Sequence, residues 1–165
     1  MVRSDAPAIA RRAGVIALGL MASLLSARVA QAQAPAQQAP AAVSQQRLFP
    51  NDGGMVLIFI KPDKTADFEM VMGKLKEAMA KSEKPERKQQ AAGWKVFKSP
   101  DPAGANTLYV FVIDPALKGA DYQVSNIIAE AFPAAEANDI LKKYADAFAQ
   151  GMNIVNLNLI QDLSK

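Results

Sequence analysis

Two continuous apolar runs in the C-terminal two thirds of the chain predict buried β-strands. The first, residues 55–60, stops at a Lys-Pro pair, and the second, residues 107–113, stops at an Asp-Pro pair. Strands that are apolar at nearly every position are typical of central positions in a sheet, where both faces are covered. Residues 94–98 and 154–160 mix polar with apolar residues, which predicts two further strands at the edges of the same sheet.

Helical periodicity separates these strands. Apolar residues at positions 68, 71, 72, 75, 78 and 79 predict an amphipathic helix, with Asp63 or Thr65 as its N-cap. A second helical region is expected from about Asp121 to Gly151, and Pro133 either divides it into two helices or kinks it. The strongly charged stretch between residues 82 and 90 is interpreted as a solvated helix end and loop.

The resulting order is strand, helix, strand, strand, helix, strand. This order predicts an α+β fold of the ferredoxin-like βαββαβ kind, with an antiparallel four-stranded sheet and the helices on one face. In that fold the first and third strands lie at the centre of the sheet, which suits the two continuous apolar runs. The second face of the sheet would then be apolar and uncovered, so we expect the domain to form a homodimer through it.

The N-terminal segment has the pattern of an export signal. Three Arg residues precede an apolar run, residues 13–25, that is too short to span a membrane, and Ala30-Gln31-Ala32 fits a small-residue cleavage site. General secretion fits better than twin-arginine export, and an uncleaved N-terminal anchor helix is the alternative. We therefore predict a cleaved signal peptide over residues 1–32, no stable membrane span after processing, and a periplasmic or secreted protein.

The next segment, residues 33–51, is rich in Ala, Gln and Pro and predicts a flexible tether, because it has little apolar surface to bury. The ferredoxin-like domain is expected to occupy residues 52–165. Cleavage after Ala32 would remove four of the 19 basic and one of the 16 acidic residues, which leaves equal numbers of positive and negative charges. A neutral domain has no general attraction for nucleic acid, so a nucleic-acid partner is not expected.

The chain contains no Cys and no His. Disulfides, thiolate nucleophiles, imidazole bases and the common zinc and haem ligands are therefore excluded, and neither a metal site nor a cofactor is predicted.

The layout resembles the dimeric α/β-barrel superfamily, which includes antibiotic-biosynthesis-type monooxygenases and stress-responsive barrel proteins. The resemblance rests on the order of the strands, the hairpin that joins residues 94–97 to 108–113, and the uncovered apolar face, and it covers about residues 54–163. It implies two sheets that pack face to face and enclose a pocket. Catalytic members commonly use His and some bind haem through His, so no catalytic residue is carried over to this chain.

Four aromatic and two amide side chains are candidates for lining such a pocket. Aromatic residues more often pack in the core or at a dimer interface, which is the alternative to a role in the pocket. The two Asn residues share a strand face and can donate hydrogen bonds to a ligand, or they can lie on a solvated edge. The candidates are Trp94, Tyr109, Phe111, Tyr122, Asn156 and Asn158.

Two functional hypotheses follow. In the first, the protein is an exported homodimeric domain that binds a small apolar ligand between its two sheets. In the second, it is a cofactor-independent enzyme of the monooxygenase or isomerase kind, whose Asn, Trp and Tyr side chains position a substrate. The absence of His favours the first hypothesis.

Overall fold

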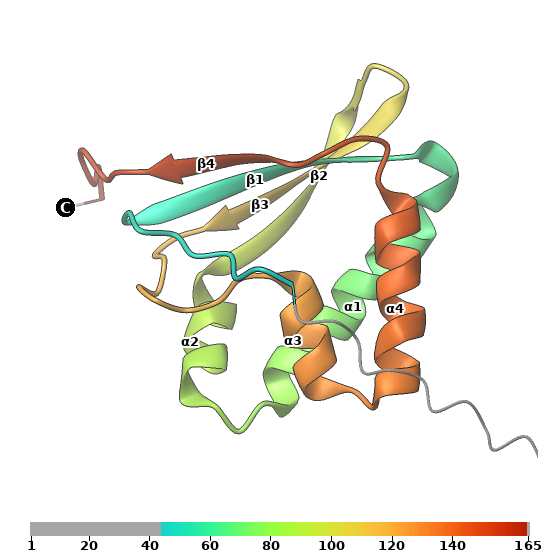
Figure 1. The fold of residues 1–165 in the computed structure, drawn as a ribbon. Coiled ribbons are helices and arrows are strands. Elements are labelled where there is room, and N and C mark those ends of the chain that lie inside the picture. Colours follow the sequence, from blue (N-terminus) through green and yellow to red (C-terminus); the bar gives the residue numbers. More distant parts are fainter. Residues whose placement is uncertain (1–43, 165) are drawn as a thin grey trace, which may run out of the picture. The chain divides into compact units, whose positions relative to one another are not determined.

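The computed structural model describes residues 44–164. Within these residues, four strands and four α-helices form an α+β fold, which confirms the predicted α+β class (Figure 1). The elements in chain order are β1 (Gly53–Ile60), the short 3-10 helix η1 (Pro62–Lys64), α1 (Thr65–Lys81), α2 (Pro85–Gly93), β2 (Trp94–Ala103), β3 (Asn106–Ile113), α3 (Val124–Ala131), α4 (Ala134–Ala147) and β4 (Asn153–Leu157).

The four strands form one antiparallel sheet in the order β2-β3-β1-β4. Strands β1 and β3 are therefore the two central strands. All four helices lie on one side of the sheet (Figure 1). We call the side that faces the helices the inner face and the opposite side the outer face.

The core lies between the inner face and the helices. Alternate residues of β1, namely Val56, Ile58 and Ile60, are at most 2% exposed, and they pack against apolar side chains of α1 and α3 such as Phe68 and Ile128. The alternate, inward-facing side chains of the strand and the apolar side of the helix thus pack together in a single core.

The charged stretch between residues 82 and 90, expected to be a solvated helix end and loop, is mostly exposed, but from Pro85 onward it forms the greater part of α2. Pro85 stands in the first turn, where its missing N–H breaks no helical hydrogen bond. Arg87 and Gln90 are buried, because both donate to the backbone oxygen of Asp121 and Arg87 also pairs with Glu130 at 3.0 Å. A polar sequence forms a helix with one buried side here because its long side chains have partners at Asp121 and at Glu130 of α3.

The ordered domain also begins before the predicted boundary at residue 52. The backbone of Arg47 donates to the Asp121 carboxylate and accepts from the N–H of Tyr122, at 2.8 Å in each case. Phe49 is 1% exposed. We call residues 44–52 the N-terminal strap, and they belong to the fold and not to a tether. The predicted signal peptide and residues 33–43 lie outside the described residues.

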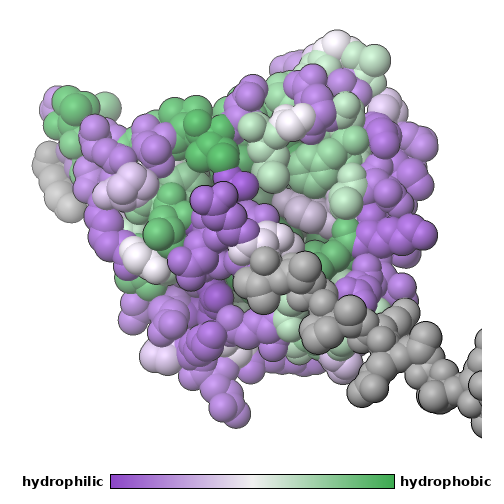
Figure 2. Space-filling model, viewed as in Figure 1, coloured by the Kyte–Doolittle hydropathy of each residue, from purple (hydrophilic) through white to green (hydrophobic). Residues whose placement is uncertain are grey.

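Two further predictions concern the C-terminal half. The second helical region is two helices, because α3 ends before Pro133 and α4 begins after it. Strand β4 is shorter than expected and ends at Leu157, and the chain beyond it exposes Leu159, Ile160 and Leu163. Hydrophobic residues are accordingly visible at the left of Figure 2, where the chain runs toward its C-terminal end. Within residues 44–164, no helix has both the length and the apolar character needed to cross a membrane.

Candidate functional site

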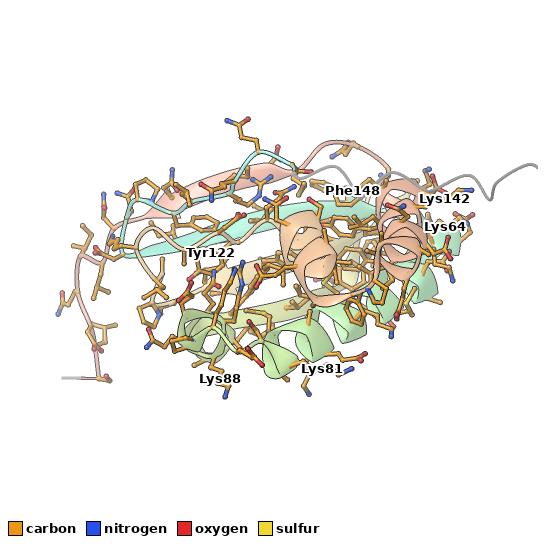
Figure 3. All side chains as sticks on the ribbon, turned by 60° about the horizontal axis from the view of Figure 1, so that its bottom comes forward. Lys64, Lys81, Lys88, Tyr122, Lys142 and Phe148 are labelled. Carbon is orange, nitrogen blue, oxygen red and sulfur yellow. The ribbon has the colours of Figure 1, made fainter. Side chains whose placement is uncertain are left out.

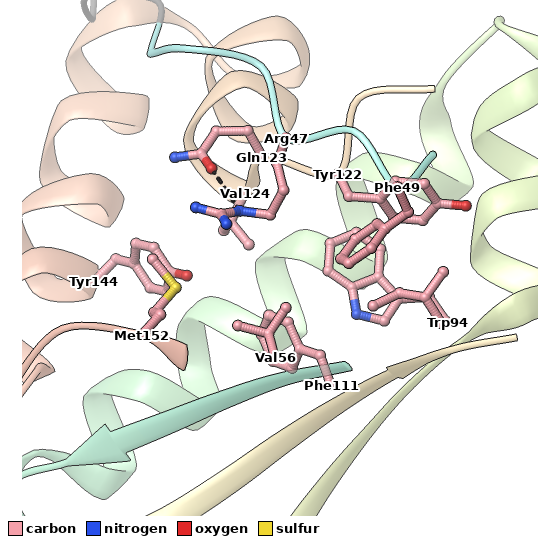
Figure 4. A pocket seen from close by; sticks show the side chains of 11 residues that line it. Arg47, Phe49, Val56, Trp94, Phe111, Tyr122, Gln123, Val124, Tyr144 and Met152 are labelled. Atoms are coloured by element: carbon pink, nitrogen blue, oxygen red, sulfur yellow. Dashed lines mark hydrogen bonds between the residues drawn. The ribbon is translucent and has the colours of Figure 1, made fainter. Parts of the chain in front are cut away.

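Three of the six predicted candidates, Trp94, Phe111 and Tyr122, line one small pocket on the inner face of the sheet (Figure 4). Trp94 meets both other rings at a centroid distance of 5.4 Å, with interplanar angles of 70° to Phe111 and 62° to Tyr122. Phe49 of the strap continues the cluster, since it meets Tyr122 edge-on, also at 5.4 Å. Edge-to-face aromatic pairs of this kind add stability beyond the area they bury. We call this cavity the strap pocket.

The polar side of the strap pocket comes from residues that the sequence did not single out. Arg47 Nε donates to Gln123 Oε1 at 3.1 Å, and both side chains line the pocket with Tyr144 (Figure 4). Burial raises the pKa of the Tyr144 hydroxyl, and the positive charge of Arg47 opposes this effect only in part. Tyr144 therefore stays protonated through the neutral range and acts as a neutral hydroxyl beside a fixed cation.

The indole N–H of Trp94 is buried and has no hydrogen-bond acceptor among the described residues. An unpaired buried donor costs free energy, which makes this group a natural partner for a small polar molecule. The free space in the strap pocket is only about 10 Å³, enough for about one water molecule. In this conformation the pocket is therefore part of the core, with no room for an organic ligand.

Tyr109 lies apart from the strap pocket, in a network at the surface of α1. Its hydroxyl donates to Glu69 Oε1 at 2.6 Å, and the same carboxylate oxygen accepts from Lys98 Nζ at 2.8 Å. Burial, followed by the hydrogen bond to Glu69, raises the pKa of Tyr109 to about 12. The Lys98 and Tyr109 hydrogen bonds lower the pKa of Glu69. This arrangement ties β2 and β3 to α1.

The two Asn candidates lie at the exposed edge of the sheet. Asn156 pairs with Gly54 in the β1–β4 ladder, which places it on the inner face, and it is exposed. Asn158 follows the end of β4, and its side-chain oxygen accepts from the Asn51 amide. Neither residue joins the aromatic cluster at the strap pocket. All four aromatic candidates and Asn156 thus lie on the helix side of the sheet, and not on the face that a second sheet would cover.

The outer face carries a different set of residues, arranged in rows by the strand register. One row runs Phe97, Val110, Leu57, Asn153 across all four strands, and the next runs Lys95, Val112, Met55, Val155. The central residues of both rows are half-buried, whereas Phe97 is 51% and Val155 is 40% exposed. Phe59 and Leu108 form a further apolar pair across the two central strands. The outer face is therefore apolar at its centre, and the two polar side chains of these rows stand on the edge strands.

The strap residues were missed because nothing local marks them. Arg47 stands in an Ala/Gln-rich segment, and its partners Gln123 and Tyr144 are 76 and 97 positions further along the chain. The one local signal that could have indicated a contact with the core is the apolar pair Leu48-Phe49 near the end of this segment. No group of three or more acidic side chains within residues 44–164 is arranged to hold a metal ion.

This chain matches no protein-family model, no curated protein sequence and no solved structure. The resemblance to the dimeric α/β barrels thus stays at the level of layout, and a functional proposal has to rest on the geometry of the two faces of the sheet.

Proposed function

We propose that the protein is an exported homodimeric module of the ferredoxin-like, dimeric α/β-barrel type, in which two sheets pack through their outer faces and hold a small apolar molecule between them. The observation that carries this proposal is the pair of residue rows on the outer face, which are apolar on both central strands. Burial of apolar surface stabilises association by about 25 cal/mol per Å² before the costs of association.

The distribution of polarity on the outer face supports an interface. Its centre is formed by Leu57, Val110, Met55 and Val112, and the polar residues of the same two rows, Lys95 and Asn153, stand at the two edges. An apolar centre with a polar rim is typical of protein interfaces.

The same distribution favours binding over catalysis. An enzyme of the cofactor-independent kind needs polar groups that point into the enclosed space. On the outer face the rows offer only Lys95 and Asn153 at the edges, while Trp94, Tyr109 and Asn156 point to the inner face. A ligand between the sheets would accordingly meet Met, Leu, Val and Phe side chains, which suits an apolar molecule held by shape and burial.

The test is the oligomeric state of the processed chain, residues 33–165, by sedimentation velocity and native mass spectrometry. We expect a dimer at micromolar concentration for the wild type and a monomer for the double variant Leu57→Lys/Val110→Lys, because two facing pairs of Lys would be buried without counter-charges. Circular dichroism shows whether the variant is still folded.

The control is Leu48→Lys, which places a new charge on the strap at a residue that is 46% exposed and follows Arg47, whose backbone is bonded to Asp121 and Tyr122. It should stay dimeric. A small molecule that co-purifies with the wild type and is lost together with the dimer would support the enclosed pocket. A monomeric wild type, or a double variant that still dimerises, would contradict the proposal.

A further inference from the structure

A groove separate from both the outer face and the strap pocket lies where α1, α2 and the edge strand β2 meet. Its volume is about 570 Å³, within the range typical of small-molecule sites. We call it the α1–α2 groove. Its lining residues are Met72, Leu75, Lys76, Met79, Ala80, Lys88, Ala91, Trp94 and Val96.

The wall of the α1–α2 groove is predominantly apolar. Val96 is 41% exposed although its neighbour in the ladder, Phe111, is buried in the core. Met72 and Met79 lie on the same side of α1, one on each side of Leu75 along the helix. Methionine is flexible and polarizable, so a wall that contains two of them adapts to a chain of variable conformation. Leu75 and Met79 are each 4% exposed and form the floor of the groove, whereas Val96, Ala80 and Ala91 are exposed, so an apolar chain laid in the groove would cover apolar side chains at its rim.

The charge of the α1–α2 groove is of one sign. Lys76 on α1 and Lys88 on α2 are exposed, and no acidic residue lines the groove. Within residues 44–164, neither of these lysines forms an ion pair or a side-chain hydrogen bond, whereas their neighbours Lys74, Lys81 and Lys84 all pair with Glu residues. Two uncompensated cations thus stand beside an apolar surface.

We propose that the α1–α2 groove binds a single-chain amphiphile with an anionic head, of the fatty-acid class. The carboxylate would pair with Lys76 and Lys88, and the hydrocarbon chain would lie over Met72, Leu75, Met79 and the Trp94–Val96 edge of the sheet. The charge complementarity and the apolar wall favour this ligand over an apolar molecule without charge. The groove is on the helix side of the sheet, so the proposal is independent of dimerisation through the outer face.

Trp94 makes the proposal directly measurable. It is the only Trp in the chain, and it lines both the α1–α2 groove and the strap pocket. A ligand in the groove therefore changes the environment of the single indole. The probes are octanoate, decanoate and laurate below their micelle concentrations, with decanol as the uncharged ligand and decyltrimethylammonium as the cationic one.

We expect a saturable change in Trp94 emission with the three carboxylates. Affinity should rise about two- to fourfold for each added CH₂, because a methylene buried in the groove contributes up to about 0.8 kcal/mol. Decanol should bind more weakly than decanoate. The double variant Lys76→Glu/Lys88→Glu should lose about tenfold in affinity for decanoate and gain affinity for decyltrimethylammonium, as two favourable exposed pairs become two repulsive ones.

The matched control is Lys142→Glu/Lys143→Glu, which changes the net charge equally on α4. Figure 3 shows Lys88 and Lys142 on opposite sides of the molecule. Both residues of the control are exposed, and only Lys143 has an ion-pair partner, Asp67 at 3.8 Å. This variant should bind decanoate like the wild type. Equal losses in the two double variants would show that net charge and not the groove controls binding, and would overturn the proposal.

Three other outcomes would also overturn it. They are the absence of a saturable signal below the micelle concentration, equal affinity for decanol and decanoate, and loss of carboxylate binding in the Leu57→Lys/Val110→Lys variant. Loss of binding in that variant would place the ligand between the two sheets. It would support the proposed function and contradict binding in the α1–α2 groove. Retained binding in that variant would support the groove whatever the oligomeric state.

Discussion

The ring of Phe49 lies directly against the backbone of Gly54 on β1. A Cβ atom at residue 54 would overlap Cγ, Cδ1 and Cε1 of that ring. The absence of a side chain at one residue of a central strand thus makes room for the aromatic anchor of the N-terminal strap. This contact links a segment that looks unstructured in the sequence to the middle of the sheet.

The first prediction concerns this contact. We expect Gly54→Ala to destabilise the fold by about 1–3 kcal/mol through overpacking, and Phe49→Ala to destabilise it by about 3–5 kcal/mol. In the Phe49→Ala background the Gly54→Ala change should cost little, since the clash is gone. Urea denaturation of the wild type, the two single variants and the double variant gives the coupling energy between the two residues. Additive losses of stability in the double variant would contradict the contact.

The control for this prediction is Gly73→Ala, because Gly73 lies in α1 with open space around it. This change should stabilise the fold by about 0.5–1 kcal/mol.

The second prediction concerns the strap as a whole. A chain that begins at Ser44 should unfold at the same urea concentration as the chain that begins at Gln33. A chain that begins at Asp52 loses Phe49 and the hydrogen bonds of Arg47 to Asp121 and Gln123, so it should be less stable by about 3–5 kcal/mol, or more. Equal stability of the two shortened chains would show that the strap contributes nothing.

The third prediction concerns the buried cation of α2. Arg87 is 6% exposed and pairs with Glu130 at 3.0 Å. Burial pushes the pKa of Glu130 up, but its hydrogen bonds from Arg87 and Lys84 outweigh that effect and leave its pKa lowered. Glu130→Gln should destabilise by about 1–2 kcal/mol at pH 7, since it leaves a partly desolvated charge without its counter-ion.

Acid should weaken the same pair in the wild type. Because the folded state lowers the pKa of Glu130, its contribution is present above the ordinary Glu pKa and is lost as the pH falls through the folded value. The difference in stability between wild type and Glu130→Gln should therefore shrink below about pH 4. Glu83→Gln is the control, because Glu83 is exposed, and its stability difference from the wild type should stay near zero at both pH values.

The fourth prediction concerns the three tyrosines. Burial raises the pKa of Tyr109 to about 12 and also raises those of Tyr122 and Tyr144. The folded chain therefore keeps these protons at a pH where the unfolded chain, with a Tyr pKa near 10, has begun to release them. Stability from this source is complete below about pH 10 and falls as the pH rises toward 12.

Absorbance at 295 nm, which reports phenolate, provides the measurement. In 6 M guanidinium all three tyrosines should titrate together near pH 10, whereas the folded protein should show little phenolate until it unfolds. Tyr109→Phe should reduce the alkaline loss of stability. A tyrosine that titrates near pH 10 in the folded protein would contradict the burial described here.

The periodicity of the sequence was sufficient for most of the fold. The runs 55–60 and 107–113 are the central strands, and the helix stripe at Phe68 and Leu75 faces the core. These elements were predictable because a helix or strand with one buried side has apolar residues at regular intervals in its sequence. Helix α2 left no such pattern, because its large buried side chains are Arg87 and Gln90, and the Asp121 oxygen that both of them bond lies more than 30 positions away.

The site was less predictable than the fold for the same reason. Aromatic residues such as Trp94 and Phe111 could be named from composition, but the face to which they point depends on the register of β2 against β3. A shift of one residue would reverse that face. Lys76 and Lys88 are unremarkable in a charged sequence, and only the packing of α2 beside α1 brings them to one groove.

The two edges of the sheet differ in a way that limits how copies of the protein can aggregate. The β2 edge carries Pro100 and Pro102, and its register shifts between Lys98 and Pro102, so another strand cannot pair along its length. The β4 edge contains no Pro. Edge-to-edge polymerisation requires two receptive edges on each molecule, and this sheet has one. Strand addition at β4 would therefore end after a single pairing, which protects a fold without disulfides from growing into fibrils.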